Sequence, residues 1–404
     1  MTLPTDQARA AGEIPLGFLV FLALMTSVVA LTIDAVLPAL DTIAVDLAFE
    51  DPNARQFIVL NVLLGMGISQ LVFGPMADAL GRRQTALIGW GVYLAGTAMA
   101  ALGPGAEWML AGRFLQGFGA GAPRVVATTL ARDLYEGRPL ARVMSLVLTV
   151  FMLIPILAPL LGQGIEAMLG WQAIFALYAA LALVSGGWYF LGVPETLKPE
   201  HRRPFRLAPL AAAFGEVIAT RQTSLCAIAA GCVFAPFVVY LATAQQVLEE
   251  LYGLGPLFPL AFSSIALAFA AATFTNSRLV MRYGMRACAR VAFLLLIGTA
   301  AAGLSISALT SGPVPPLWVY LGLIALIFVG VALLFSNLTA LALDPLGHLA
   351  GTASAVVNAV SSLLATGMGI AIAQAYDGTL TPMLSGFLVL GLAGYLCFLA
   401  GVKR

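Results

Sequence analysis

Three charged side chains lie inside long apolar stretches of this sequence, and they are the residues best placed to do chemistry. Asp34 lies within a nearly continuous apolar run over residues 14–40, and Arg113 and Arg124 lie within another run over residues 108–130. A run of about 20 apolar residues can span a bilayer, and a charge at its centre costs about 2.5 to 3.5 kcal/mol. Such residues usually face a bundle interior or a water-filled cavity, so we interpret Asp34 as the centre of function.

Arg113 is a candidate partner for Asp34. Each of the two lies about six residues from the outer end of its predicted helix, hence at similar depth, so an ion pair or a water-bridged pair is available if both helices line one cavity. Arg124 follows Arg113 by eleven residues, which places both on nearly the same helix face, about 16 Å apart. The alternatives are that Arg113 extends to the outer headgroups and Arg124 to the cytoplasmic headgroups.

The composition indicates a membrane protein with many spans. Of the 404 residues, 61% are hydrophobic and 10% are charged, whereas a soluble domain carries about 25% charged residues. When the apolar runs are divided at charges and at Pro and Gly clusters, they predict an all-α fold with twelve transmembrane helices. Their approximate ranges are 14–40, 56–76, 84–103, 108–130, 141–163, 171–191, 223–245, 256–275, 288–309, 317–341, 351–374 and 382–401.

The longest polar stretch separates two groups of six predicted helices. We therefore expect an N-terminal six-helix bundle over residues 1–191, a cytoplasmic linker over 192–221 and a C-terminal six-helix bundle over 222–404. If both termini are cytoplasmic, nearly all of the 20 Lys and Arg residues fall on the cytoplasmic side, with Arg55 as the external exception. This asymmetry follows the positive-inside rule and predicts that orientation.

The loop after the second predicted helix reads GPMADALGRR over residues 74–83. It resembles the signature loop of the major facilitator superfamily, G-x-x-x-D-x-x-G-R-[RK], in which glycines permit a sharp turn. The resemblance implies that Asp78 docks near residues 351–353 and that Arg82 lies near Asp133, which closes an inner gate. The gate residues are Gly74, Asp78, Gly81, Arg82, Arg83 and Asp133. The alternative is a basic loop with only a structural turn.

Two further stretches fit the same superfamily. Residues 113–121, RFLQGFGAG, are similar to its R-x-x-Q-G motif, and their small residues permit close helix packing. Residues 155–162, PILAPLLG, resemble the antiporter motif G-P-x-x-G with alanine in place of the first glycine, and the motif residues are Pro155, Pro159 and Gly162. A plain kinked helix is the alternative. With TIDAVLPAL of the first helix, these stretches resemble the Bcr/CflA branch of drug:proton antiporters, whose members export chloramphenicol-type and bicyclomycin-type antibiotics.

Polar and adaptable residues on other helices complete the expected substrate cavity. Its members are Asp34, Arg113, Arg124, Asn61, Met152, Tyr240 and Asn358. Polar side chains in apolar helices also join helices to one another, which is the alternative for Asn61, Tyr240 and Asn358, and Met152 could instead face lipid or core. The two His and four Cys residues lack metal-ligand spacing, so we expect no metal, no cofactor and no catalytic residues, and we do not expect an enzyme.

Proton coupling has Asp34 and Arg113 as its candidates. A change in the distance between them, or in hydration, could switch the protonation of Asp34 as the protein alternates between inward-facing and outward-facing states. We therefore expect proton-coupled efflux of small-molecule drugs such as amphenicol-type antibiotics. The alternative is a proton-coupled exporter or importer of a small metabolite on the same fold. Two cations against one acid also favour neutral, zwitterionic or anionic compounds over dications.

The resemblance also implies where the protein acts and what it meets there. We expect a multi-pass protein of a bacterial inner membrane with both termini in the cytoplasm. The expected partners are a small-molecule substrate, protons and the lipid bilayer, with no nucleic acid. We expect the chain to be a monomer.

Overall fold

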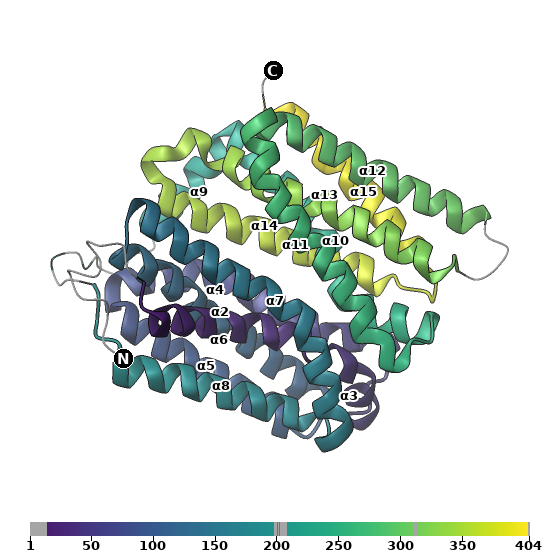
Figure 1. Cartoon of the computed structure of the whole chain (residues 1–404), viewed down its shortest axis with the longest axis horizontal. Coiled ribbons are helices and arrows are strands. Elements are labelled where there is room, and N and C mark those ends of the chain that lie inside the picture. The colour runs from purple at the N-terminus through teal and green to yellow at the C-terminus, as the bar shows by residue number, and fades with distance from the viewer. Residues whose placement is uncertain (1–13, 198–199, 201, 203–207, 310–313, 403–404) are drawn as a thin grey trace. The chain divides into compact units, whose positions relative to one another are not determined.

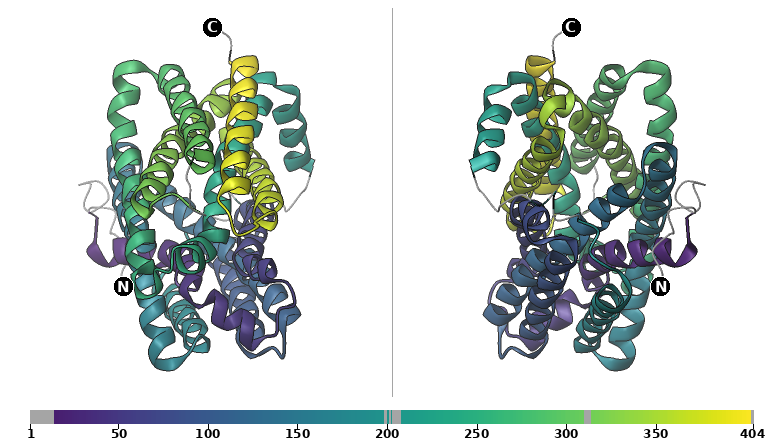
Figure 2. Two further views of the ribbon diagram at one scale, coloured as in Figure 1. Left: turned by 90° about the vertical axis from the view of Figure 1, so that its right-hand side faces the viewer. Right: turned by 90° about the vertical axis from the view of Figure 1, so that its left-hand side faces the viewer.

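The computed structural model describes residues 14–197, 200, 202, 208–309 and 314–402. Within these ranges every regular element is helical (Figure 1, Figure 2). Twelve of the described helices have 19 or more residues. They are α2 (Leu16–Asp34), α4 (Phe57–Leu80), α5 (Arg82–Leu102), α6 (Ala106–Leu134), α7 (Gly137–Leu169), α8 (Gln172–Gly192), α10 (Arg221–Gln245), α11 (Phe258–Tyr283), α12 (Met285–Leu309), α13 (Leu317–Leu343), α14 (Ala350–Gln374) and α15 (Thr381–Gly401).

Eleven helical stretches of the described chain are long and apolar enough to cross a membrane. The remaining long helix, α6, falls short in hydropathy because Arg113, Gln116, Arg124 and several glycines dilute its apolar residues. Arg113 and Arg124 are two of the three charged residues that were predicted to do chemistry. The expectation of an all-α membrane protein is confirmed.

The first predicted helix, 14–40, is interrupted, which corrects the sequence analysis. α2 ends at Asp34, a 3₁₀ turn follows over Leu37–Ala39, and the short helix α3 spans Leu40–Asp46. Pro38 gives the reason. In a continued helix the carbonyl of Asp34 would accept a hydrogen bond from the N–H of residue 38, and proline has no N–H. The helix therefore ends at the acidic residue itself.

The chain divides into two compact units. The first comprises Met1–Phe49 and Asn61–Leu207, and the second comprises Glu50–Leu60 and Ala208–Arg404. Residues 50–60, expected in the N-terminal bundle, are thus part of the second unit. The division into two six-helix bundles stays a prediction.

The expected linker, 192–221, includes a helical segment. It contains the short helix α9 (Ala208–Ala219), which packs on α10 and α14 and buries Ala213 and Val217. An alanine-rich sequence with apolar residues at helical spacing explains this helix.

In the first unit, α2 packs against α6, α7 and α8, and the buried core includes Phe18, Phe21 and Tyr189. The small residues of α6 allow close helix packing, as expected. A Cβ at Gly117 would overlap the Val62 carbonyl of α4, and one at Gly119 would overlap the backbone of α5. α6 is thus held between α4 and α5 with one fixed rotation about its axis.

In the second unit, α10 packs against α13, α14 and α15. An aromatic cluster extends from α10 to α11 and α13. Its members are Phe234, Phe237, Tyr240, Phe262, Phe269, Phe328 and Phe335, with ring centroids of contacting pairs 4.9 to 6.2 Å apart. Contacts between aromatic rings therefore join α10, α11 and α13 in this unit.

Candidate functional site

Asp34 lies at the C-terminal end of α2 with 4% of its surface exposed. Its carboxylate makes no hydrogen bond and no ion pair with any residue that the structure describes. Burial of a carboxylate without a partner is costly. This acid is therefore suited to bind a proton, a cation or a hydrogen-bonding substrate.

Arg113, on α6, is completely buried. Its guanidinium donates to the Gln116 side-chain oxygen at 2.6 Å and to the Thr32 backbone carbonyl at 2.8 Å, and it lies 5.7 Å from the ring centre of Phe175. The alternative in which this side chain extends to the headgroups is therefore wrong. Asp34 forms no ion pair with Arg113. The Arg113 guanidinium instead binds the backbone carbonyl of Thr32, two residues before Asp34 in α2.

Hydrogen bonds extend this polar site to α5. Gln116 donates to the Thr97 hydroxyl at 2.9 Å, and the hydroxyls of Thr32 and Tyr93 are 2.6 Å apart. All of these side chains are buried. The guanidinium is thus fixed by a network that reaches from α6 to α2 and α5.

Tyr178, on α8, was missed by the sequence analysis. It is completely buried, and its hydroxyl finds no hydrogen-bond partner among the described residues. The same hydroxyl lies within electrostatic range of Arg113, Tyr93 and Asp34. The sequence did not indicate that Tyr178 belongs to the site. Tyrosines are common near the ends of membrane helices, so a tyrosine in an apolar helix does not by itself mark a functional residue.

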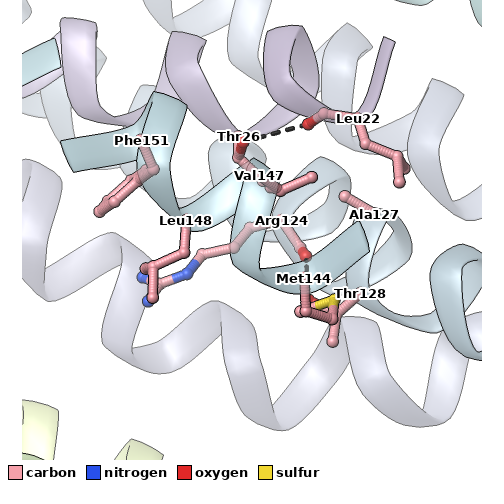
Figure 3. A pocket seen from close by; sticks show the side chains of 9 residues that line it. All are labelled: Leu22, Thr26, Arg124, Ala127, Thr128, Met144, Val147, Leu148 and Phe151. Atoms are coloured by element: carbon pink, nitrogen blue, oxygen red, sulfur yellow. Dashed lines mark hydrogen bonds between the residues drawn. The ribbon is translucent and has the colours of Figure 1, made fainter. Parts of the chain in front are cut away.

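Arg124 lies eleven residues after Arg113 on α6 and lines a pocket of about 200 Å³ in the first unit. Side chains of α2, α6 and α7 surround this pocket (Figure 3). The full lining is Leu22, Thr26, Arg124, Ala127, Thr128, Met144, Val147, Leu148 and Phe151. The role of Arg124 in substrate binding stays a prediction.

None of the other predicted cavity residues is among the residues that line this pocket. Asn61 donates to the Leu110 carbonyl at 3.0 Å and so joins α4 to α6, which is its expected alternative role. Met152 is half-buried on α7 and does not line the pocket. In the second unit, Tyr240 belongs to the aromatic cluster, and Asn358 donates to the Ser354 hydroxyl at 3.3 Å.

The gate loop forms a compact ionic cluster in the first unit. Arg82 donates to Asp133 at 3.0 Å, to Asp78 at 2.7 Å and to the Ala77 carbonyl at 2.7 Å. Arg82 thus lies near Asp133 as the resemblance implied, while the gating role of the cluster and the docking of Asp78 near residues 351–353 stay predictions. Arg83 donates to the backbone carbonyl of Phe190, and its guanidinium carbon lies 4.9 Å from the centre of the Phe190 ring.

The expectation that both glycines form the turn is wrong for Gly74. α4 continues through Gly74 to Leu80, and the chain reverses at Gly81, where φ is +102°. A left-handed φ of this kind favours glycine. Only the second glycine of the motif is therefore required by the turn.

Glu195, which follows the end of α8, caps α5. Its carboxylate accepts from the backbone N–H groups of Arg82 at 2.9 Å and Arg83 at 3.1 Å. These are the first residues of α5, where N–H groups lack partners within the helix. The carboxylate also complements the positive end of the helix dipole. This contact ties the end of the first unit to its gate loop.

The motif over residues 155–162, on α7, packs against the point where α2 ends. α7 is one helix of 33 residues that contains Pro155 and Pro159. At Gly162 an added Cβ would overlap the backbone carbonyl of Ala35, the residue after Asp34. α7 therefore approaches α2 closely at the residue next to the acid of the site.

A second polar group, not foreseen from the sequence, surrounds residues 50–60 in the second unit. We call Asn53, Gln56, Gln246 and Gln374 the glutamine cluster. Gln56 donates to Gln246 at 2.7 Å, Gln246 donates to the Asn53 side chain at 3.0 Å, and Gln374 donates to Gln56 at 2.9 Å. Beside it, Arg55, expected as an external cation, forms a salt bridge with Glu250.

Sequence and structure comparisons agree with this architecture. A family model described as Major Facilitator Superfamily matches residues 22–370. A bicyclomycin resistance protein homolog of Haemophilus influenzae is 30% identical over 381 residues, which cover 91% of each chain. A chloramphenicol resistance protein of Pseudomonas aeruginosa is 31% identical over 328 residues, which cover 78% of this chain and 74% of that protein.

Solved structures support the fold. The crystal structure of a peptide transporter in complex with sulfate has a TM-score of 0.74 at 14% identity, covering 95% of this chain and 92% of that one. At that identity the likeness concerns the fold alone. The matched model and the relatives together carry the assignment of family: this chain belongs to the major facilitator superfamily, as a membrane transporter rather than an enzyme, and it resembles the Bcr/CflA-type drug efflux proteins.

Proposed function

We propose that this transporter exports small-molecule drugs, amphenicol-type antibiotics among them, in exchange for protons. The observation that carries the proposal is the setting of Asp34, a buried carboxyl at a helix end with no ion pair among the described residues. The names of the relatives add support for drug cargo, since they include resistance to bicyclomycin and to chloramphenicol.

The coupling step that we propose uses the neighbouring guanidinium. Arg113 donates to the Thr32 carbonyl, two residues before Asp34. A small shift of the α2 end against α6 would exchange that carbonyl for the Asp34 carboxylate as the acceptor. A carboxylate paired with arginine is stable in its ionised form, so the shift releases the proton. Return of the helix end leaves the carboxyl buried without its partner and ready to bind a proton again.

We further propose a bacterial inner membrane as the location, with both termini in the cytoplasm. The distribution of Lys and Arg along the sequence supports this orientation. The gate cluster of Arg82, Asp78 and Asp133 would then close the cytoplasmic side of the first unit in one state of the cycle.

Everted vesicles with an imposed pH gradient test the coupling. Asp34→Asn keeps the shape of the side chain but cannot exchange a proton, so we expect it to abolish gradient-driven chloramphenicol accumulation and substrate-induced proton release. Glu107→Gln, which changes an exposed acid at the start of α6, should leave both signals at the wild-type level. Accumulation by Asp34→Asn at the wild-type rate would refute proton exchange at this residue.

A further inference from the structure

The pocket beside Arg124 has a defined charge and shape that the proposed function does not use. It is about 200 Å³ in volume and lies wholly within the first unit, between α2, α6 and α7. Drug-sized pockets commonly have about 300 to 1,000 Å³. A pocket of this volume accommodates a small molecule, or one end of a larger one.

Arg124 supplies the charge of this pocket. It is the ionisable residue among the nine that line the pocket. Arg124 is an exposed residue, and its guanidinium makes no hydrogen bond or ion pair with the described residues. A guanidinium offers five N–H donors in a planar fork that matches carboxylate geometry.

The two hydroxyl groups that line the pocket already donate to backbone carbonyls, so they do not donate to a ligand. Thr26 donates to the carbonyls of Leu22 and Ala23, each at 3.0 Å, and Thr128 donates to the Arg124 carbonyl at 3.2 Å. Each hydroxyl has one proton. The donors that remain for a ligand in this pocket are therefore those of Arg124.

The rest of the pocket is apolar and adaptable. Met144, Val147, Leu148 and Phe151, all from α7, form one wall (Figure 3). Methionine fits ligands of varied shape, and an aromatic ring packs well on another flat ring. The pocket thus combines an apolar wall with a single cationic donor.

We propose that this pocket binds small aromatic monoanions, with their carboxylate or a similar oxyanion on Arg124 and their apolar body against α7. The proposal deepens the proposed function, since it rests on transport of small molecules by this chain and names the class of compound that the first unit selects. A bidentate pair of this kind is stronger than a hydrogen bond between neutral groups.

Binding of three matched probes to the purified full chain in nanodiscs tests the proposal. The probes are 2-naphthoate, 2-naphthamide and 2-naphthylmethylamine, which share one body and differ in charge. Isothermal titration should give the wild-type protein the highest affinity for the anion. Arg124→Gln should lower the affinity for naphthoate by about tenfold or more, since a hydrogen bond to a charged group is lost, and should leave the amide nearly unchanged.

Three further variants separate charge from shape and from folding. Arg124→Lys, which keeps the charge but loses the fork, should retain part of the preference for the anion. Arg142→Gln changes an exposed arginine of α7 outside the pocket and should behave as wild type. Leu148→Trp fills the pocket and should lower the affinity for all three probes.

Several outcomes would overturn the proposal. They are equal affinity of the wild-type protein for all three probes, tighter binding of the amine, no binding of any probe, or an anion preference that survives in Arg124→Gln. The assay needs no proton gradient, so it is independent of the Asp34 experiment. If Asp34→Asn still exports drugs while Arg124→Gln loses the anion, the coupling proposal fails and this one stands. If Asp34→Asn loses transport while Arg124→Gln keeps the anion, proton exchange at Asp34 stands and anion binding at Arg124 is refuted.

Discussion

At the scale of single residues, the site depends on hydrogen bonds to backbone as much as on charge. Arg113 is held by the side chain of Gln116 on its own helix and by the carbonyl of Thr32 on α2. That carbonyl lies in the last turn of a helix, where carbonyls lack helical partners and carry partial negative charge. The helix end thus acts as an acceptor for arginine while the carboxylate of Asp34 is left for other partners.

Tyr178 offers a test that separates coupling from stability. Its hydroxyl is buried without a hydrogen bond to any described residue, near Arg113 and Asp34. If this hydroxyl binds Asp34 in another state of the cycle, Tyr178→Phe should lower proton-driven transport by about tenfold, the loss expected for one hydrogen bond to a charged group. The thermal unfolding midpoint should stay level or rise, because no hydrogen bond of this state is removed.

Tyr320→Phe is the matched control for that test. It removes a buried hydroxyl that likewise lacks a partner among the described residues, on α13 in the second unit. Equal transport by the two variants, or a fall in the unfolding midpoint that accounts for the loss in Tyr178→Phe, would exclude a role for this hydroxyl in coupling.

At the scale of helices, apolar runs predicted the positions of the spans because about 20 apolar residues are enough to cross a bilayer. The same rule hid the break in the first span, since Pro38 lies within an otherwise continuous apolar stretch. Motif resemblance placed Arg82 near Asp133. The capping of α5 by Glu195 could not be predicted, because it depends on where a segment more than 100 residues later returns.

The contact of α7 with the break in α2 gives a prediction for Gly162. Gly162→Ala would place a methyl group on the Ala35 carbonyl and push α7 away from the end of α2. We expect loss of proton-driven transport with a lower unfolding midpoint, by the few degrees typical of overpacking that costs about 1 to 3 kcal/mol. Scanning fluorimetry and vesicle transport measure the two effects.

Gly164→Ala provides the control on the same helix. It lies two residues away, and its added Cβ would meet no atom within 4 Å. This variant should match the wild-type protein or gain slightly in stability, since alanine favours a helix more than glycine does. If both variants transport alike, the close contact at Gly162 has no part in the mechanism.

At the scale of the whole molecule, the chain crosses between its two units more often than a simple division into halves requires. It leaves the first unit after Phe49, contributes residues 50–60 to the second unit and returns at Asn61. The glutamine cluster explains this, since it joins residues that are 190 to 321 positions apart. No local pattern could predict such pairs, because uncharged amides in a loop carry no signal of a distant partner.

The membership of residues 50–60 in the second unit has a consequence for fragment complementation. If the gene is divided after Leu207, the N-terminal fragment still carries residues 50–60, which are part of the other fragment's folded unit. Co-expressed fragments 1–207 and 208–404 should therefore copurify through a tag on either one. Gln56→Ala combined with Gln374→Ala should reduce the recovered partner, whereas Asn61→Ala, whose hydrogen bond lies within the first unit, should not. Undiminished recovery with the double variant would show that the amides do not hold the pieces together.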